Sequence, residues 1–121
     1  MTSTGVGLDI DSERRDGTVV LRAHGELDLE TAAALCGPLD AEIRMPRSRV
    51  LLDLADVTFC DSTGLRALMG VAREARVHRT RLVIVVPPET GVRRLVELTG
   101  TAEFLPLPAD RDAGLQLLSP A

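Results

Sequence analysis

Two strongly apolar segments joined by one helix-length segment constrain the fold most. "RVLLDLADV" at 49–57 is predicted to be a strand, and the unbroken apolar run of "RLVIVV" at 81–86 is typical of a strand buried on both faces of a sheet. Between them, 62–78 carries apolar residues at helical spacing. Strand-helix-strand connections make the two strands parallel, and such sheets carry functional groups at the carboxyl ends of strands. The sequence "CDSTG" at 60–64 is therefore the first candidate site.

Upstream of this unit, the sequence predicts a hairpin and a helix. Apolar and polar residues alternate over 8–11 and 18–23, on either side of an Asp-Gly turn. A helix then follows Asp28 or Thr31, either of which can cap it. Pro38 lies in its interior, where proline removes one hydrogen bond and clashes with the preceding turn at a cost of about 3 kcal/mol. We therefore expect a kink or a break there. The inward-facing residues are Leu35, Leu39 and Ile43.

Downstream, the sequence predicts two more helices and a last short strand. A helix is expected over 89–100, a strand over 102–108, and a closing helix capped by Asp110. The predicted class is α/β, a mixed sheet of four to five strands with about four helices. We expect a single domain over 1–121 with its core over about 8–118.

Composition excludes several classes of function. The net charge of −4 gives no broad attraction to nucleic acid or anionic membranes. All 14 basic residues are arginine, which excludes Schiff-base lysines and Walker-type phosphate lysines. The two cysteines and two histidines have no ligand-like spacing, so neither a disulfide framework nor a metal site is predicted. We expect a protein partner, no enzymatic activity and no cofactor.

No segment predicts export or membrane insertion. The first residues lack a basic region followed by an apolar run, and the longest apolar run, 82–86, is too short to span a bilayer. We therefore expect a cytoplasmic protein.

Ser62 has three candidate roles at the start of the central helix. Its hydroxyl can cap the helix. It can be a hydrolase nucleophile, but His78 lies roughly 24 Å away along the helix and His24 precedes it, contrary to the hydrolase order. It can also be phosphorylated, because the unpaired amides and positive dipole of a first helical turn tolerate a charge of about −1.5 to −2. Beside Asp61, that charge would repel a bound partner.

Three longer motifs together resemble one family. "HGELDLETA" at 24–32, "VLLDLADVTFCDSTGLRAL" at 50–68 and "RLVIVVPPETGVRRLVELTG" at 81–100 are similar to the anti-sigma factor antagonists, small proteins made of one STAS domain. The resemblance implies that the unphosphorylated protein binds an anti-sigma factor that is also a serine kinase, which frees a sigma factor. Phosphorylation by that kinase ends the complex, and a metal-dependent serine phosphatase restores it.

The resemblance also assigns site residues, with phosphorylation on Ser62. Gly64 is expected to admit a partner's backbone, and Leu65 to anchor the turn in the core. Asp28 neighbours the serine if the second predicted strand lies beside the third. Arg66 departs from the small residue that the family often has there, and it can clasp a phosphate, contact an acidic partner or stay solvated. We expect the partner-binding residues to be Asp28, Asp61, Thr63, Gly64, Leu65 and Arg66.

Two rival functions stay open. One is a STAS domain that serves as a fixed, never phosphorylated subunit of a lipid-transport or signalling assembly. The other is a small serine hydrolase. Phosphate on Ser62 after incubation with a cognate kinase and ATP would separate the switch from both. We expect a monomer or a weak dimer.

Overall fold

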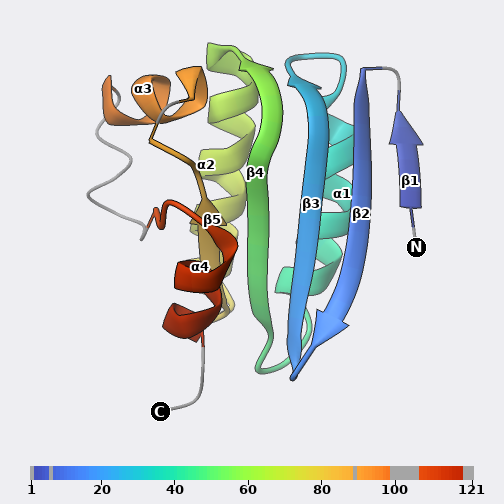
Figure 1. Ribbon diagram of the computed structural model, residues 1–121. Coiled ribbons are helices and arrows are strands. Elements are labelled where there is room, and N and C mark those ends of the chain that lie inside the picture. Colours follow the sequence, from blue (N-terminus) through green and yellow to red (C-terminus); the bar gives the residue numbers. More distant parts are fainter. Residues whose placement is uncertain (1, 6, 89, 99–106, 119–121) are drawn as a thin grey trace.

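Within the residues that the structure describes, the protein forms a five-stranded mixed sheet with helices on both faces (Figure 1). The computed structural model describes residues 2–5, 7–88, 90–98 and 107–118. The sheet order is β1-β2-β3-β4-β5. The strands are β1 (Thr2–Gly5), β2 (Leu8–Arg15), β3 (Thr18–Leu27), β4 (Arg49–Cys60) and β5 (Arg81–Val85), and the helices are α1 (Ala32–Ile43), α2 (Ser62–Val77), α3 (Gly91–Leu98) and α4 (Arg111–Leu118).

The helices divide unequally between the two faces of the sheet (Figure 1). α1 and α2 cover one face, and Val92 and Val96 of α3 join the larger core beneath them. α4 covers part of the other face, where Leu118 packs against β3, β4 and β5. β5 and the first half of β4 are therefore buried on both sides, which explains the unbroken apolar run of β5, whereas Asp53 interrupts the run of β4.

The strand directions bring two strand ends to one edge of the sheet. β2 and β3 form the predicted antiparallel hairpin, whereas β3, β4 and β5 run parallel. The carboxyl ends of β3 and β4 consequently lie side by side, and α2 starts there. β1 was not predicted. The strand expected over 102–108 falls almost wholly outside the described residues, whereas Asp110 caps α4 as predicted, accepting the Ala113 amide at 2.8 Å.

The break expected in α1 does not occur. The helix continues from Ala32 to Ile43 with Pro38 inside it. Proline has no amide hydrogen, so one backbone hydrogen bond is missing. Leu35 and Leu39, on either side of Pro38, are fully buried. Their packing outweighs the local preference of proline, since tertiary contacts supply most of the stability of a helix.

β3 and α2 meet at Gly64. The Asp61 amide donates a hydrogen bond to the Leu27 carbonyl at 3.3 Å. A Cβ on Gly64 would lie 2.5 Å from the Leu27 carbonyl oxygen and 2.9 Å from Leu27 Cγ. Only glycine therefore lets α2 start this close to the end of β3.

Replacing Gly64 by alanine should destabilise the protein by about 1–3 kcal/mol, because the nearest obstructing atom is a backbone carbonyl oxygen that cannot move aside cheaply. Gly70→Ala is the matched control on the same helix, since a Cβ there meets nothing within 4 Å. That control should be neutral or stabilising by up to about 1 kcal/mol. Urea unfolding measures both variants, and equal stabilities would contradict the close contact.

Candidate functional site

Ser62 is the first residue of α2, and its side chain is exposed, as predicted. It is not the helix cap, which corrects one candidate role. Asp61 caps the helix, because its Oδ1 accepts the Gly64 amide at 2.8 Å and its carbonyl accepts the Leu65 amide at 3.0 Å. No hydrogen bond within the described residues engages the Ser62 hydroxyl. The hydroxyl is thus presented to solvent on a helix start that another residue fixes.

Asp28 organises the turn that follows β3. Its Oδ1 accepts the amides of Glu30 at 3.0 Å and Thr31 at 3.1 Å. The Thr31 hydroxyl accepts the Asp28 amide at 2.9 Å and donates to the Glu26 carbonyl at 2.8 Å. Thr31 is itself buried. The turn is therefore held in one conformation before any partner binds.

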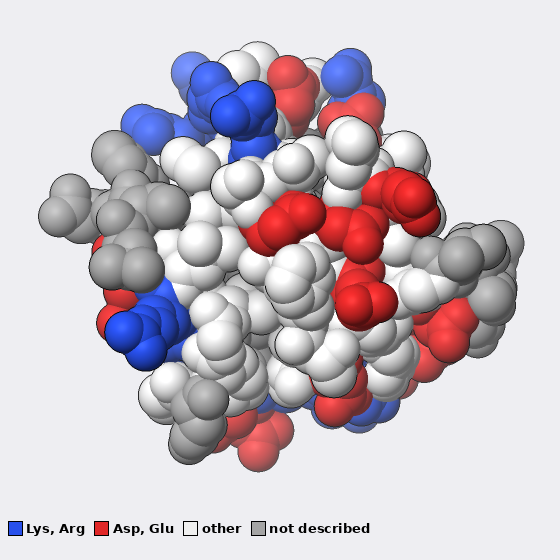
Figure 2. Space-filling view, turned by 90° about the horizontal axis from the view of Figure 1, so that it is seen from above, with Lys and Arg blue, Asp and Glu red and all other residues white. Residues whose placement is uncertain are grey.

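The Asp28 turn and the start of α2 form one acidic edge, called here the β3-β4 edge and comprising residues 26–31 and 59–66. Leu27 pairs with Cys60 in register, so Asp28 and Asp61 follow directly from neighbouring residues. Figure 2 looks onto this end of the molecule, where acidic side chains gather near the middle of the face. The acidic residues of the edge are Glu26, Asp28, Glu30 and Asp61.

Sequence reasoning missed two exposed apolar side chains at this edge. Leu29 is 74% exposed in the Asp28 turn, and Phe59 is 48% exposed near the end of β4. The register of β3 and β4 slips between Gly25 and Glu26, which pair with Val57 and Phe59. Such a bulge re-aims side chains, so simple alternation could not place Phe59, whereas an apolar residue inside a polar turn was a usable signal for Leu29. Acidic and apolar groups together suit a protein partner.

The remaining predicted residues divide between surface and core. Thr63 is half-buried and Arg66 is exposed. Gly64 is buried against Leu27 of its own chain, so the close approach expected of a partner's backbone is made within the protein. Leu65 is buried and anchors the turn, as predicted.

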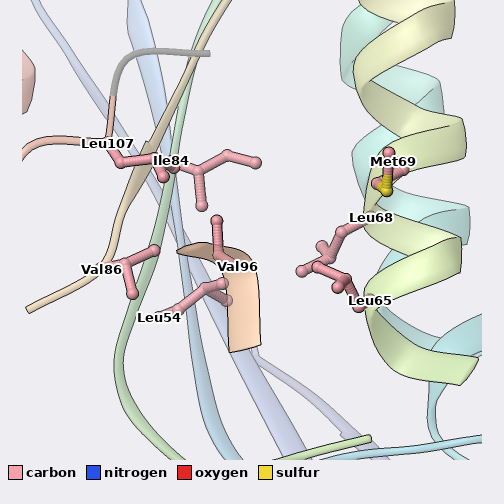
Figure 3. A pocket seen from close by; sticks show the side chains of 8 residues that line it. All are labelled: Leu54, Leu65, Leu68, Met69, Ile84, Val86, Val96 and Leu107. Carbon is pink, nitrogen blue, oxygen red and sulfur yellow. The ribbon is translucent and has the colours of Figure 1, made fainter. Parts of the chain in front are cut away.

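Leu65 lines a small apolar cavity beneath α2 (Figure 3). Its volume of about 10 Å³ is scarcely enough for one water molecule, and its walls offer no polar side chain to hold one. This cavity therefore offers no room for a ligand. The lining residues are Leu54, Leu65, Leu68, Met69, Ile84, Val86, Val96 and Leu107.

Neither histidine is placed to activate Ser62. His24 lies between two carboxylates, with Nε2 3.2 Å from Asp11 and Nδ1 3.2 Å from Asp56. It pairs with Asp56, which lies four residues, or roughly 13 Å at about 3.3 Å per residue, before the end of β4, and Ser62 follows two residues beyond that end. His78 follows the far end of α2. This geometry argues against the hydrolase.

The described residues contain no group of three or more His, Cys, Asp or Glu side chains that could hold a metal ion. None of the helices formed by these residues has the length and apolar character needed to cross a membrane.

Cys60 is two residues before Ser62, and its thiol is unreactive by environment. Burial, and secondarily the Asp61 carboxylate, raise its pKa to about 11 from an ordinary value of 9.0. Because a thiol is a nucleophile only as the thiolate, Cys60 is protonated and inert near neutral pH.

Cys60 should therefore react with iodoacetamide far more slowly than a free thiol at pH 8, with a rate that rises until about pH 11. The unfolded chain loses this proton first, so the stability contributed by the protonated thiol is lost as pH rises through that range. A Cys36→Ser variant isolates Cys60 for mass spectrometry. Alkylation as fast as that of free N-acetylcysteine at pH 8 would contradict the burial effect.

Comparisons with known proteins agree with the observed fold. The family model described as "Mlab, STAS domain" matches residues 10–107. The anti-sigma F factor antagonist of Paenibacillus polymyxa is 28% identical over 105 residues, which cover 84% of this chain and 87% of that protein. The crystal structure of an anti-sigma factor antagonist from Mycobacterium paratuberculosis is 29% identical with a TM-score of 0.81, and the match covers 96% and 97% of the two chains.

A third similarity shows the fold alone. SpoIIAA, a Bacillus cell fate determinant solved in its phosphorylated form, is 20% identical with a TM-score of 0.69, and the match covers 91% of this chain and 99% of that one. The family match extends over most of the sheet and the whole β3-β4 edge. The chain therefore belongs to the STAS domain family and, within it, resembles the anti-sigma factor antagonists.

Proposed function

We propose that this protein is an anti-sigma factor antagonist that binds its partner through the β3-β4 edge and is switched off by phosphorylation of Ser62. One observation carries the proposal: the Ser62 hydroxyl is exposed on a helix start that Asp61 already caps. A kinase can therefore reach the hydroxyl without first breaking a hydrogen bond that holds the fold.

The unphosphorylated edge suits a protein partner. Leu29 and Phe59 supply exposed apolar contacts, and four carboxylates around them favour a partner with basic groups. The proposed partner is an anti-sigma factor with serine kinase activity, and binding it releases a sigma factor. Both proteins would act in the cytoplasm, without nucleic acid or membrane contacts by this chain.

Phosphorylation would change charge more than shape. The kinase brings ATP, the bond from the γ-phosphorus to the Ser62 oxygen forms as the bond to ADP breaks, and the hydroxyl proton passes to a base on the kinase. The product adds about −1.5 to −2 charges beside Asp61. Juxtaposed like charges can cost an interface several kcal/mol, and about 3 kcal/mol is roughly a hundredfold in affinity.

The framework around the serine tolerates this charge. The Gly64 amide is used by Asp61, while the amides of Ser62 and Thr63 lie in the first turn of α2, at the positive end of the helix dipole. The contact between Gly64 and Leu27 lies beneath the serine and does not involve its side chain. A metal-dependent serine phosphatase would reverse the reaction and restore binding.

Substitutions at Ser62 test the switch. Since Asp61 is the cap, Ser62→Ala should change the free energy of unfolding by less than about 0.5 kcal/mol and bind the anti-sigma partner normally. Ser62→Asp should weaken binding at least about tenfold, or 1.4 kcal/mol. Isothermal titration calorimetry measures affinity, and mass spectrometry after incubation with the kinase and ATP locates the phosphate.

Thr63→Ala is the matched control, because Thr63 is the neighbouring hydroxyl but is half-buried. It should still accept one phosphate, whereas Ser62→Ala should accept none. Equal affinities of phosphorylated and unphosphorylated wild type for the partner would refute the switch. A protein that the kinase never modifies would instead support the fixed STAS subunit.

A further inference from the structure

We propose that Arg66 clasps the phosphate on Ser62, so that the modified serine is held and partly neutralised by its own helix. This inference rests on the phosphorylation proposed above. It makes Arg66 a positioning residue for the phosphoserine and gives the phosphorylated state a structure of its own.

The spacing on α2 brings the two side chains together. Ser62 and Arg66 are four residues apart, about 40° around the helix and about 6 Å along its axis, and both are exposed. Side chains at this spacing meet, and an acidic group that precedes a basic one is the favourable order. An ion pair with the same spacing forms at the end of α1, where the guanidinium of Arg44 lies 2.9 Å from the Asp40 carboxylate.

Arg66 is available for this contact. No hydrogen bond or ion pair from the described part of the chain engages its guanidinium, whereas Arg44 pairs with both Asp40 and Glu74. The carboxylate nearest to it in sequence, Asp61, is five residues away and is occupied in capping α2. The Arg66 side chain can therefore turn toward a new anion without giving up an existing partner.

The surface around Ser62 is negatively charged, so a nearby cation would stabilise an added phosphate. The β3-β4 edge holds four carboxylates, and Arg66 is its one basic residue. A phosphate on Ser62 would enter this acidic surface next to Asp61. A guanidinium can donate two parallel hydrogen bonds to a phosphate, which lysine cannot do. Phosphorylation would thus add negative charge and also withdraw Arg66 from a bound partner.

The titration of the phosphate tests the clasp without a kinase. Phosphoserine is incorporated at position 62 during translation, and ³¹P NMR follows the phosphate of the full chain through its second ionisation, near pH 6. Arg66→Gln should move the titration midpoint upward by roughly 0.4 pH unit relative to wild type, because the dianion loses its cation. The midpoint of Arg66→Lys should lie between those of wild type and Arg66→Gln, since lysine keeps the charge but cannot donate two parallel hydrogen bonds.

Arg73→Gln is the matched control. Arg73 is exposed on nearly the same face of α2, about 20° from Ser62, but roughly 16 Å along the axis. Arg73→Gln removes the same charge, so the titration midpoint of this variant should equal that of wild type. Unchanged midpoints in all three variants would overturn the clasp, as would equal shifts in Arg66→Gln and Arg73→Gln.

The experiment separates this inference from the function on which it rests. If the anti-sigma kinase leaves Ser62 unmodified, the proposed switch fails, yet the titration of the incorporated phosphoserine still reports whether Arg66 binds it. If the kinase modifies Ser62 and the titration is insensitive to Arg66, the clasp alone is wrong. Thermal unfolding of unphosphorylated Arg66→Gln should match wild type, which shows that the variant is folded.

Discussion

The approach of Gly64 to the backbone of Leu27 is the constraint on which the rest of the site depends. It fixes where α2 starts relative to β3, and the hydrogen bond from the Asp61 amide to the Leu27 carbonyl holds the same junction. With that junction fixed, Asp61 can cap the helix and Ser62 is left facing solvent. The Asp28 turn, which follows Leu27, is brought to the same edge.

Arginine serves two different purposes in this chain. Arg49 donates to the carbonyls of Leu118 and Asp16, at 3.1 Å and 2.8 Å, and so ties the end of α4 to the turn between β2 and β3. Arg93 similarly joins Val86 to Leu107. These guanidiniums are committed to backbone oxygens and stabilise the framework. Arg66 has no such partner within the described residues, so its guanidinium can bind an anion at the β3-β4 edge.

Regular periodicity predicted most of the framework. The alternating hairpin, the parallel β4 and β5, and the start of α2 at Ser62 were all readable from apolar spacing, because long-range packing and local pattern agree there. The break expected at Pro38 does not occur, since the buried leucines around it outweigh its local preference.

The finer features of the site depend on contacts between segments distant in sequence. Asp61 and Ser62 are both plausible caps in a sequence, and only the observed start of the helix shows which one accepts the Gly64 amide. Phe59 reaches the surface through a slip in the pairing of two strands, which no pattern within β4 encodes. Gly64 was expected to admit a partner's backbone, and within the protein it is the backbone of Leu27 that lies against it.

Hydrogen exchange of the phosphorylated protein can show whether the β3-α2 junction stays closed when Ser62 carries a phosphate. The amides of Asp61, Gly64 and Leu65 report on that junction, because each donates a bond within it. Their protection should agree within about twofold between protein with phosphoserine at 62 and unmodified protein. A loss of more than about tenfold, or 1.4 kcal/mol, would show that phosphorylation opens the junction and acts by refolding.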